Sequence, residues 1–191
     1  MEEIAEKAGS IKRIKLQNFM CHSSLVIELE DHVNFITGQN GSGKSAILTA
    51  LCVAFGIKAR GTQRASSLKD FIKNGCGCGS VSVDIKNEGE DAFKPPLYGK
   101  VITVERQITE TTQTFCMKDE KGKKVAGKRE DLQELLDHFN IEVDNPCVIM
   151  TQDKSREFLH AGSGKEKFKF YFKSYTAAAS GRAPDDNTGE N

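Results

Sequence analysis

The sequence lacks several features that would assign it to a class directly. Its 27 Lys and Arg residues equal its 27 Asp and Glu residues, so the zero net charge does not indicate a nucleic-acid partner. No apolar run approaches the ~20 residues that a membrane-spanning helix needs. The N-terminus, M-E-E-I-A-E-K, is acidic and does not show the basic and then apolar order of a secretion signal. We therefore expect the chain in the cytosol or the nucleus.

Zinc-binding patterns are also missing. Cys76 and Cys78 form C-G-C rather than C-x₂-C, and no second cysteine pair follows at ligand spacing. The four histidines are equally scattered along the chain. We interpret the six cysteines as free thiols in a reducing compartment, and the sequence predicts no metal cluster.

The chain is long enough for one domain with a hydrophobic core. Its 191 residues are 38% hydrophobic and 28% charged, which is typical of a soluble globular protein with polar ends. We expect a flexible leader over 1–10 and a P-loop domain over 11–173. The stretch 174–191 is small, polar and rich in helix breakers, which predicts disorder. There are no internal repeats.

Apolar patterning predicts strands and helices in a mixed order. Period-2 alternation or short β-branched runs predict strands at 11–19, 23–29, 33–37, 80–86, 100–108 and 146–150. Residues 112–125 read as a hairpin, and 87–99 as an exposed connection with Pro and Gly breakers. Helical spacing predicts helices from Lys44 to about Gly56 and over 128–139. A short helix is expected between Ser66 or Ser67 and Gly75. This order predicts an α/β nucleotide-binding lobe with an added antiparallel β layer.

The strongest local motif is G-Q-N-G-S-G-K-S, which matches the phosphate-binding pattern G-x-x-x-x-G-K-[ST]. Its residues are Gly38, Gln39, Asn40, Gly41, Ser42, Gly43, Lys44 and Ser45. Glycines let the backbone curl so that N–H groups face phosphate oxygens, and a following helix adds the positive end of its dipole. Lys44 is expected to reach the β and γ phosphates, and the Ser45 hydroxyl to bind Mg²⁺. An apolar run before the loop and an apolar helix after it favour nucleotide binding over a chance glycine-rich loop.

Three weaker signals each allow two interpretations. Gln152 follows the predicted strand 146–150, at the end where open α/β sheets bind ligands, but it is also compatible with an ordinary surface glutamine. A basic stretch follows the first helix, and another flanks the first strand. Their residues are Lys58, Arg60, Arg64 and Lys69, and Lys12, Arg13 and Lys15. These residues either contact DNA phosphates or form a solvated charged face.

Three segments together resemble a known family. They are I-K-R-I-K-L-Q-N-F-M-C-H, V-N-F-I-T-G-Q-N-G-S-G-K-S-A-I-L-T-A-L and V-I-M-T-Q-D-K-S-R-E-F-L. They look like the start of the ATPase head of an SMC (structural maintenance of chromosomes) protein. S-S-L-K-D-F-I-K-N-G and K-F-K-F-Y-F-K are most similar to the sixth eukaryotic SMC type. The resemblance covers about residues 10–173.

The resemblance implies an ABC-type fold that holds ATP and Mg²⁺ between two engaged heads. It implies that Gln152 is the Q-loop glutamine, which helps to hold Mg²⁺ and the attacking water, and that Arg64 is a loop arginine linked to DNA response. Residues 18–22 would lie near the nucleotide. The implied partners are an SMC subunit of the five type, its non-SMC subunits, and a C-terminal half-head. The implied role is chromosome maintenance and DNA double-strand-break and recombinational repair in the nucleus.

Motifs of the family's C-terminal half are not found in these 191 residues. There is no L-S-G-G signature, no apolar strand ending in Asp-Glu after Gln152, and no heptad run after K-F-K-F-Y-F-K. We therefore expect weak nucleotide binding, negligible ATP hydrolysis by this chain alone, and unpaired strand edges that lower its solubility. The sequence leaves open whether the chain is a splice product, a gene fragment or a short protein that binds a separate C-terminal half.

Two other functions remain to be weighed. A non-catalytic module that docks on SMC partners would use the same fold without needing the nucleotide. A free-standing P-loop kinase or GTPase is disfavoured, because no acceptor site and no N-K-x-D motif is present.

Overall fold

The computed structural model of the chain describes residues 8–57, 65–143, 148–160, 163–165 and 167–168. The chain forms two compact units, Met1–Phe139 and Asn140–Asn191. The predicted tail at 174–191 lies outside the described residues, as does most of the predicted leader. None of the described helices has the length and apolar character to cross a membrane.

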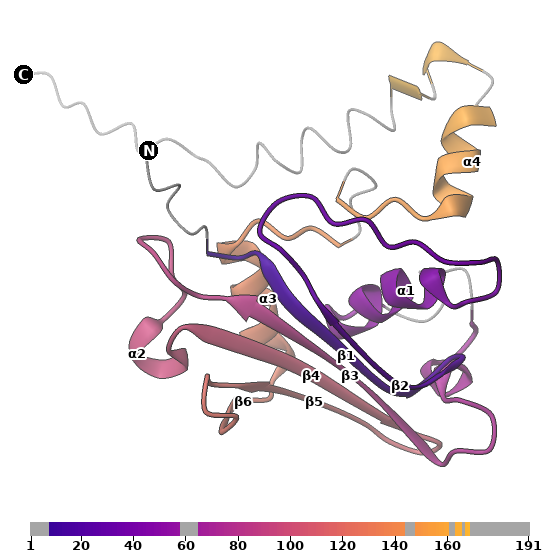
Figure 1. Ribbon diagram of the computed structural model, residues 1–191. Coiled ribbons are helices and arrows are strands. Elements are labelled where there is room, and N and C mark those ends of the chain that lie inside the picture. The colour runs from indigo at the N-terminus through magenta and orange to yellow at the C-terminus, as the bar shows by residue number, and fades with distance from the viewer. Residues whose placement is uncertain (1–7, 58–64, 144–147, 161–162, 166, 169–191) are drawn as a thin grey trace, which may run out of the picture. The chain divides into compact units, whose positions relative to one another are not determined.

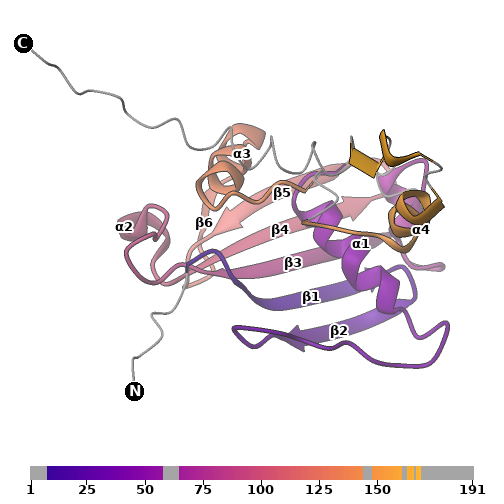
Figure 2. The same cartoon turned by 90° about the horizontal axis from the view of Figure 1, so that it is seen from above.

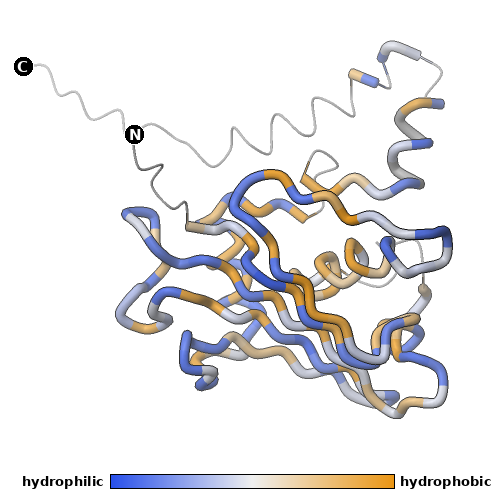
Figure 3. The backbone as a smooth tube through the Cα atoms, viewed as in Figure 1, coloured by the Kyte–Doolittle hydropathy of each residue, from blue (hydrophilic) through white to orange (hydrophobic). Residues whose placement is uncertain are grey.

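A six-stranded antiparallel sheet forms the centre of the first unit, in the order β2-β1-β3-β4-β5-β6 (Figure 1). The strands are β1 (Ile11–Phe19), β2 (His22–Glu28), β3 (Cys78–Lys86), β4 (Val101–Thr109), β5 (Gln113–Lys118) and β6 (Lys124–Ala126). The predicted strands at 11–19, 23–29, 80–86 and 100–108 and the predicted hairpin are therefore confirmed within a residue or two. Figure 3 shows hydrophilic and hydrophobic residues alternating along the longer strands, because successive side chains point to opposite faces.

One face of the sheet is apolar and carries the helix α1 (Lys44–Ala54), which crosses it in Figure 2. The register aligns apolar residues of neighbouring strands on this face, such as Leu16 with Val81 and Val83 with Val104. These four side chains are at most 2% exposed, and each contributes about 1.5–3 kcal/mol by burial. Against them α1 packs its small and apolar residues Ala46, Ile47, Ala50, Val53 and Ala54.

The opposite face of the sheet is polar. Asp84 on β3 is only 2% exposed there, and Arg13 on β1 donates to its carboxylate at 2.7 Å. The Thr103 hydroxyl on β4 donates to the same carboxylate at 2.8 Å. Because burying an unpaired carboxylate is very unfavourable, these partners are what allow an acidic residue at the middle of the sheet.

Short elements complete the first unit. The predicted short helix forms as η2 (Leu68–Phe71), a 3₁₀ helix with Ser67 as its N-cap, but it ends before Gly75. The Phe71 ring packs on Phe19 with centroids 5.6 Å apart, which fixes η2 against the end of β1. The helix α3 (Arg129–His138) forms as predicted, with Leu132, Leu135 and Leu136 buried.

The connection 87–99 is less exposed than the sequence predicted. It contains a short helix, α2 (Pro95–Tyr98), and Phe93 and Tyr98 are 4% and 2% exposed. The Asn87 side chain binds the backbone of Phe93 in both directions, at 2.7 and 2.9 Å. A buried amide that satisfies its donors and acceptors locally holds this connection folded in spite of its breakers.

The prediction of a buried strand at 33–37 is wrong. These residues form no helix or strand, and Val33 and Phe35 are 74% and 87% exposed. A β-branched run becomes a strand only when a neighbouring strand bonds its backbone, and no described strand pairs with it.

The second unit contains α4 (Gln152–His160) among its described residues. The strand predicted at 146–150 is wrong where the structure describes it, because residues 148–150 form no strand and Val148 is 50% exposed. Residues 146–147 lie outside the described residues.

Candidate functional site

The glycine loop that precedes α1 has the backbone geometry that its sequence predicts. Gly41 and Gly43 have φ angles of 85° and 89°, in the left-handed region that favours glycine. Gly43 is the N-cap of α1, so the helix begins at Lys44. Residues 38–42 are exposed to solvent.

This helix N-terminus is suited to an anion. The first N–H groups of any α-helix have no partner inside the helix, and the helix dipole adds positive potential at the same end. No acidic residue lies in the first turn of α1 to offset that potential. The loop and the start of the helix together therefore form an electropositive backbone surface of the kind that binds phosphate.

Lys44 folds back over the loop. Its Nζ atom donates to the carbonyl oxygens of Gly38 at 2.6 Å and Gln39 at 2.8 Å. The ammonium group is thereby held on the exposed side of the loop, where it supplies one unit of positive charge. Exchanging these exposed bonds for a phosphate oxygen replaces neutral acceptors with a charged one.

A turn from another part of the chain supports the loop. The Nε2 atom of His22 lies 3.3 Å from the Gly43 carbonyl oxygen. A Cβ atom added at Gly43 would lie 2.5 Å from Cys21 Sγ and would also collide with the His22 ring. The resemblance implied that 18–22 lie near the nucleotide, and the structure places Cys21 and His22 against the loop that is predicted to hold it.

Gln152, the second predicted Mg²⁺ ligand, is exposed at the first position of α4. It lies in the unit Asn140–Asn191, whereas the glycine loop lies in Met1–Phe139. It begins a helix and does not follow a described strand, so the sheet-edge argument for it no longer applies. Its role as the Q-loop glutamine stays a prediction from the family resemblance.

The basic residues proposed for DNA occupy different environments. Arg13 is bound to Asp84 and also lies 3.4 Å from Glu28, and the Asp84 hydrogen bond is the main cause that raises the pKa of Arg13. Lys15 lies 3.5 Å from Asp84, whereas Lys12 is exposed. Lys58, Arg60 and Arg64 lie outside the described residues. DNA contact through these residues stays a prediction, and the sequence alone gave no sign that Arg13 has an internal partner.

No group of three or more His, Cys, Asp or Glu side chains that could hold a metal ion occurs in the part of the chain that the structure describes. No disulfide joins the cysteines that the structure describes, which are Cys21, Cys52, Cys76, Cys78 and Cys116. A Mg²⁺ ion at the loop would be held by the Ser45 hydroxyl and by the phosphates themselves, which is how this ion is usually bound beside nucleotides. Ser45 is exposed at the start of α1 and is compatible with that role.

Comparisons with known proteins identify a family for the chain. A family model for an AAA domain matches residues 13–180. Structural maintenance of chromosomes protein 6B of Arabidopsis thaliana is 68% identical over 166 residues, which cover 87% of this chain and 16% of that protein. Structural maintenance of chromosomes protein 6 of Homo sapiens is 43% identical over 171 residues, covering 88% and 16%. This chain therefore spans about a sixth of the length of these relatives.

The fold also matches a solved structure. A chain from a study of ATP-driven dimerization and DNA-stimulated activation of SMC ATPases superposes with a TM-score of 0.71 at 22% identity, covering 85% of this chain and 97% of that one. The resemblance that the sequence predicted is confirmed, and so is the ABC-type α/β fold. The chain belongs to the AAA-domain family, whose family model matches residues 13–180, and it is similar in sequence and in fold to the head region of SMC proteins.

Proposed function

We propose that this chain is the ATP-binding N-terminal half of an SMC-type ATPase head that acts in chromosome maintenance and DNA repair in the nucleus. The observation that carries the proposal is the loop Gly38–Ser45. Its residues 38–42 are exposed, it leads into an 11-residue helix with no acidic residue in the first turn, and the Lys44 ammonium lies over it.

Several groups of the chain bind different parts of Mg·ATP. Backbone N–H groups of the loop bind the β-phosphate, Lys44 neutralises charge on the β and γ phosphates, and the Ser45 hydroxyl ligates Mg²⁺. Mg²⁺ supplies further neutralisation of the phosphate charge. Gln152 would orient water and complete the Mg²⁺ ligands.

Binding by these residues does not amount to hydrolysis. Phosphoryl transfer needs a held Mg²⁺, an oriented water and stabilisation of developing charge at the same time. The 191 residues contain neither an Asp-Glu strand end after Gln152 nor an L-S-G-G motif to supply the remaining groups. We propose that these groups come from a C-terminal half-head and from a partner head of the SMC five type.

A steady-state ATPase assay tests this division of labour. The purified chain is expected to show no turnover above background, and mixing it with a separately produced C-terminal half-head should produce turnover that Lys44→Ala abolishes. Steady turnover by the chain alone, abolished by Lys44→Ala, would show that the chain already contains a complete catalytic site.

The exposed apolar segment 33–36 favours a second candidate, a non-catalytic module that docks on SMC partners. Val33, Phe35 and Ile36 are 74%, 87% and 43% exposed, and exposed apolar patches often mark protein interfaces. Co-purification with SMC partner subunits discriminates the two functions. Nucleotide-dependent capture that Lys44→Ala removes supports the ATP-binding half-head, whereas capture indifferent to ATP and to Lys44→Ala supports the docking module.

A further inference from the structure

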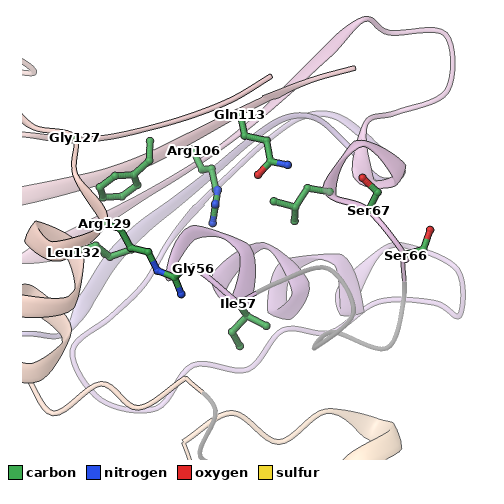
Figure 4. Close-up of a pocket in the computed structure, with 11 residues that line it drawn as sticks. Gly56, Ile57, Ser66, Ser67, Arg106, Gln113, Gly127, Arg129 and Leu132 are labelled. Carbon is green, nitrogen blue, oxygen red and sulfur yellow. The ribbon is translucent and has the colours of Figure 1, made fainter. Parts of the chain in front are cut away.

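A cavity of about 570 Å³ lies at the other end of α1 from the glycine loop. It is bordered by Gly56 and Ile57 after α1, by Ser66–Leu68, by β4 and β5, and by the start of α3 (Figure 4). Because α1 has 11 residues and an α-helix rises ~1.5 Å per residue, the two sites are separated by about 16 Å of helix. The proposed nucleotide site does not use this cavity.

The cavity is basic. Arg106 on β4 and Arg129, the first residue of α3, both line it, and the lining residues that the structure describes include no aspartate or glutamate. Figure 4 shows the Arg106 side chain extending from its strand into the cavity, with Gln113 beside it. The described lining residues thus contribute two guanidinium groups and no carboxylate, so their side chains make the cavity positive.

The Arg106 guanidinium has a hydrogen-bond partner for one of its nitrogens and none among the described residues for another. One of its terminal nitrogens, Nη1, donates to the Val53 carbonyl oxygen at 3.0 Å, at the C-terminal end of α1. Its Nε atom is buried and has no hydrogen-bond partner among the described residues. Burial is the main cause that lowers the pKa of Arg106, and the charge of Arg129 lowers that pKa further. The bond from Nη1 caps the C-terminal end of α1. That role does not account for the buried Nε donor or for a second arginine beside it.

The remaining walls combine polar and apolar groups. Ser67 and Gln113 contribute a hydroxyl and an amide, while Leu68, Phe115 and Leu132 contribute an apolar surface. Cavities that bind small ligands typically have this mixture of apolar walls and a few polar groups that fix orientation. The volume of about 570 Å³ is in the range of such cavities.

We propose that this cavity binds a small phosphate monoester whose organic group is aromatic or apolar. The phosphate is bound by Arg106 and Arg129, with Ser67 and Gln113 as further donors, and the organic group lies against Phe115, Leu68 and Leu132. Two arginines favour a phosphate over a carboxylate, because a phosphate monoester carries about −1.5 to −2 charges at pH 7 and accepts charge-assisted bonds from both.

Calorimetric titration of the full chain with phenyl phosphate tests the proposal. The titration is made in Lys44→Ala protein, so that phosphate binding at the glycine loop does not contribute. We expect saturable 1:1 binding that Arg129→Gln weakens at least ~10-fold, since it removes one charge-assisted donor. Lys121→Gln is the matched control, because it removes the same charge from an exposed position in the β5–β6 turn and should leave the affinity unchanged.

Two further ligands identify the chemistry. Inorganic phosphate should bind more weakly than phenyl phosphate because it makes no contact with the apolar wall, and benzoate should bind at least ~10-fold more weakly because it carries a single charge. The proposal is overturned if phenyl phosphate does not bind to Lys44→Ala protein, if Arg129→Gln and Lys121→Gln have equal effects, or if benzoate binds as tightly as phenyl phosphate. Arg129 is exposed, so Arg129→Gln is expected to fold, and circular dichroism of each variant verifies this.

Discussion

The Nε2 atom of His22 lies 3.3 Å from the carbonyl oxygen of Gly43, so the start of β2 contacts the last glycine of the glycine loop. The two residues are 21 positions apart. Cys21 approaches the same glycine so closely that a Cβ atom there would lie 2.5 Å from its sulfur. The shape of the loop therefore depends both on glycine's backbone freedom and on space that only glycine leaves.

Alanine substitutions at two glycines separate these two effects. Gly43→Ala should lower the free energy of unfolding by about 2–4 kcal/mol, because it combines left-handed backbone strain with a collision against Cys21 and His22. Gly41→Ala is the control, since its φ angle of 85° is similar but no atom lies within 4 Å of the added Cβ. It should cost only about 1–2 kcal/mol. If urea denaturation shows equal losses of unfolding free energy for the two variants, Cys21 and His22 do not restrict the space at Gly43.

Arg13 is expected to stabilise the folded chain through its bond to Asp84, whether or not it also contacts DNA. Arg13→Gln removes the main partner of the buried Asp84 carboxylate and should lower the free energy of unfolding by about 1–2 kcal/mol, with Thr103 and Lys15 limiting the loss. Lys12→Gln removes the same charge from the adjacent exposed position and should change it by less than about 0.5 kcal/mol. Urea denaturation of both variants measures this free energy. If Lys12→Gln lowers it as much as Arg13→Gln does, the stabilising role of the Arg13–Asp84 pair is contradicted.

Serine substitutions at Phe35 and Phe71 compare the exposed segment 33–36 with the core. Phe71→Ser should destabilise the chain by about 3–5 kcal/mol, because Phe71 is 1% exposed and its ring packs on Phe19. Phe35→Ser should change stability by less than about 0.5 kcal/mol, because Phe35 is 87% exposed. Phe35→Ser should also raise the solubility limit of the chain, since it removes an exposed aromatic from an apolar segment. If Phe35→Ser destabilises the chain as much as Phe71→Ser, segment 33–36 is packed in solution.

Asp70 should contribute a pH-dependent share of stability. Hydrogen bonds from the Ser67 N–H, the Ser66 hydroxyl and the Ser66 N–H, in that order of importance, lower the pKa of Asp70 below its ordinary value of 3.8. A carboxylate whose pKa is lower in the folded state stabilises fully above its unfolded pKa and loses that effect as pH falls through the folded pKa.

The corresponding experiment compares wild type with Asp70→Asn. The difference in unfolding free energy between the two proteins should be constant between pH 5 and pH 7, which lie above ~3.9, the unfolded pKa of aspartate, and shrink below it. Asp137→Asn, which makes the same charge change on the exposed side of α3, serves as the control. A difference for Asp70→Asn that grows as the pH falls would have the wrong sign for this account.

Local patterns were sufficient to predict much of this structure. Period-2 alternation identified β1, β3 and β4, because each has one face on the core and one on a polar surface. The motif at 38–45 identified the loop, and Gly56 with φ of 92° marks the end of α1 where the sequence predicted it. In these cases the residues that decide the structure are neighbours along the chain.

The errors involve partners that are distant in sequence. Segments 33–37 and 148–150 were both predicted as strand, but neither is paired in the described sheet. The Arg13–Asp84 pair joins residues 71 positions apart, and the Arg106 bond to Val53 joins residues 53 apart. The sequence left open whether Arg13 contacts DNA or faces solvent, because the sequence does not show which carboxylate the antiparallel register brings opposite it.

Equilibrium binding of Mg·ATP to the chain and to Lys44→Ala is the most direct test of the central claim. Isothermal titration should show 1:1 binding to the wild type, and Lys44→Ala should weaken it at least ~10-fold because the ammonium supplies charge-assisted bonds to the phosphates. Arg129→Gln, in the cavity at the other end of α1, should leave this affinity unchanged. Absence of Mg·ATP binding to the folded wild-type chain, or equal affinity in Lys44→Ala, would contradict the assignment of Gly38–Ser45 as a nucleotide site.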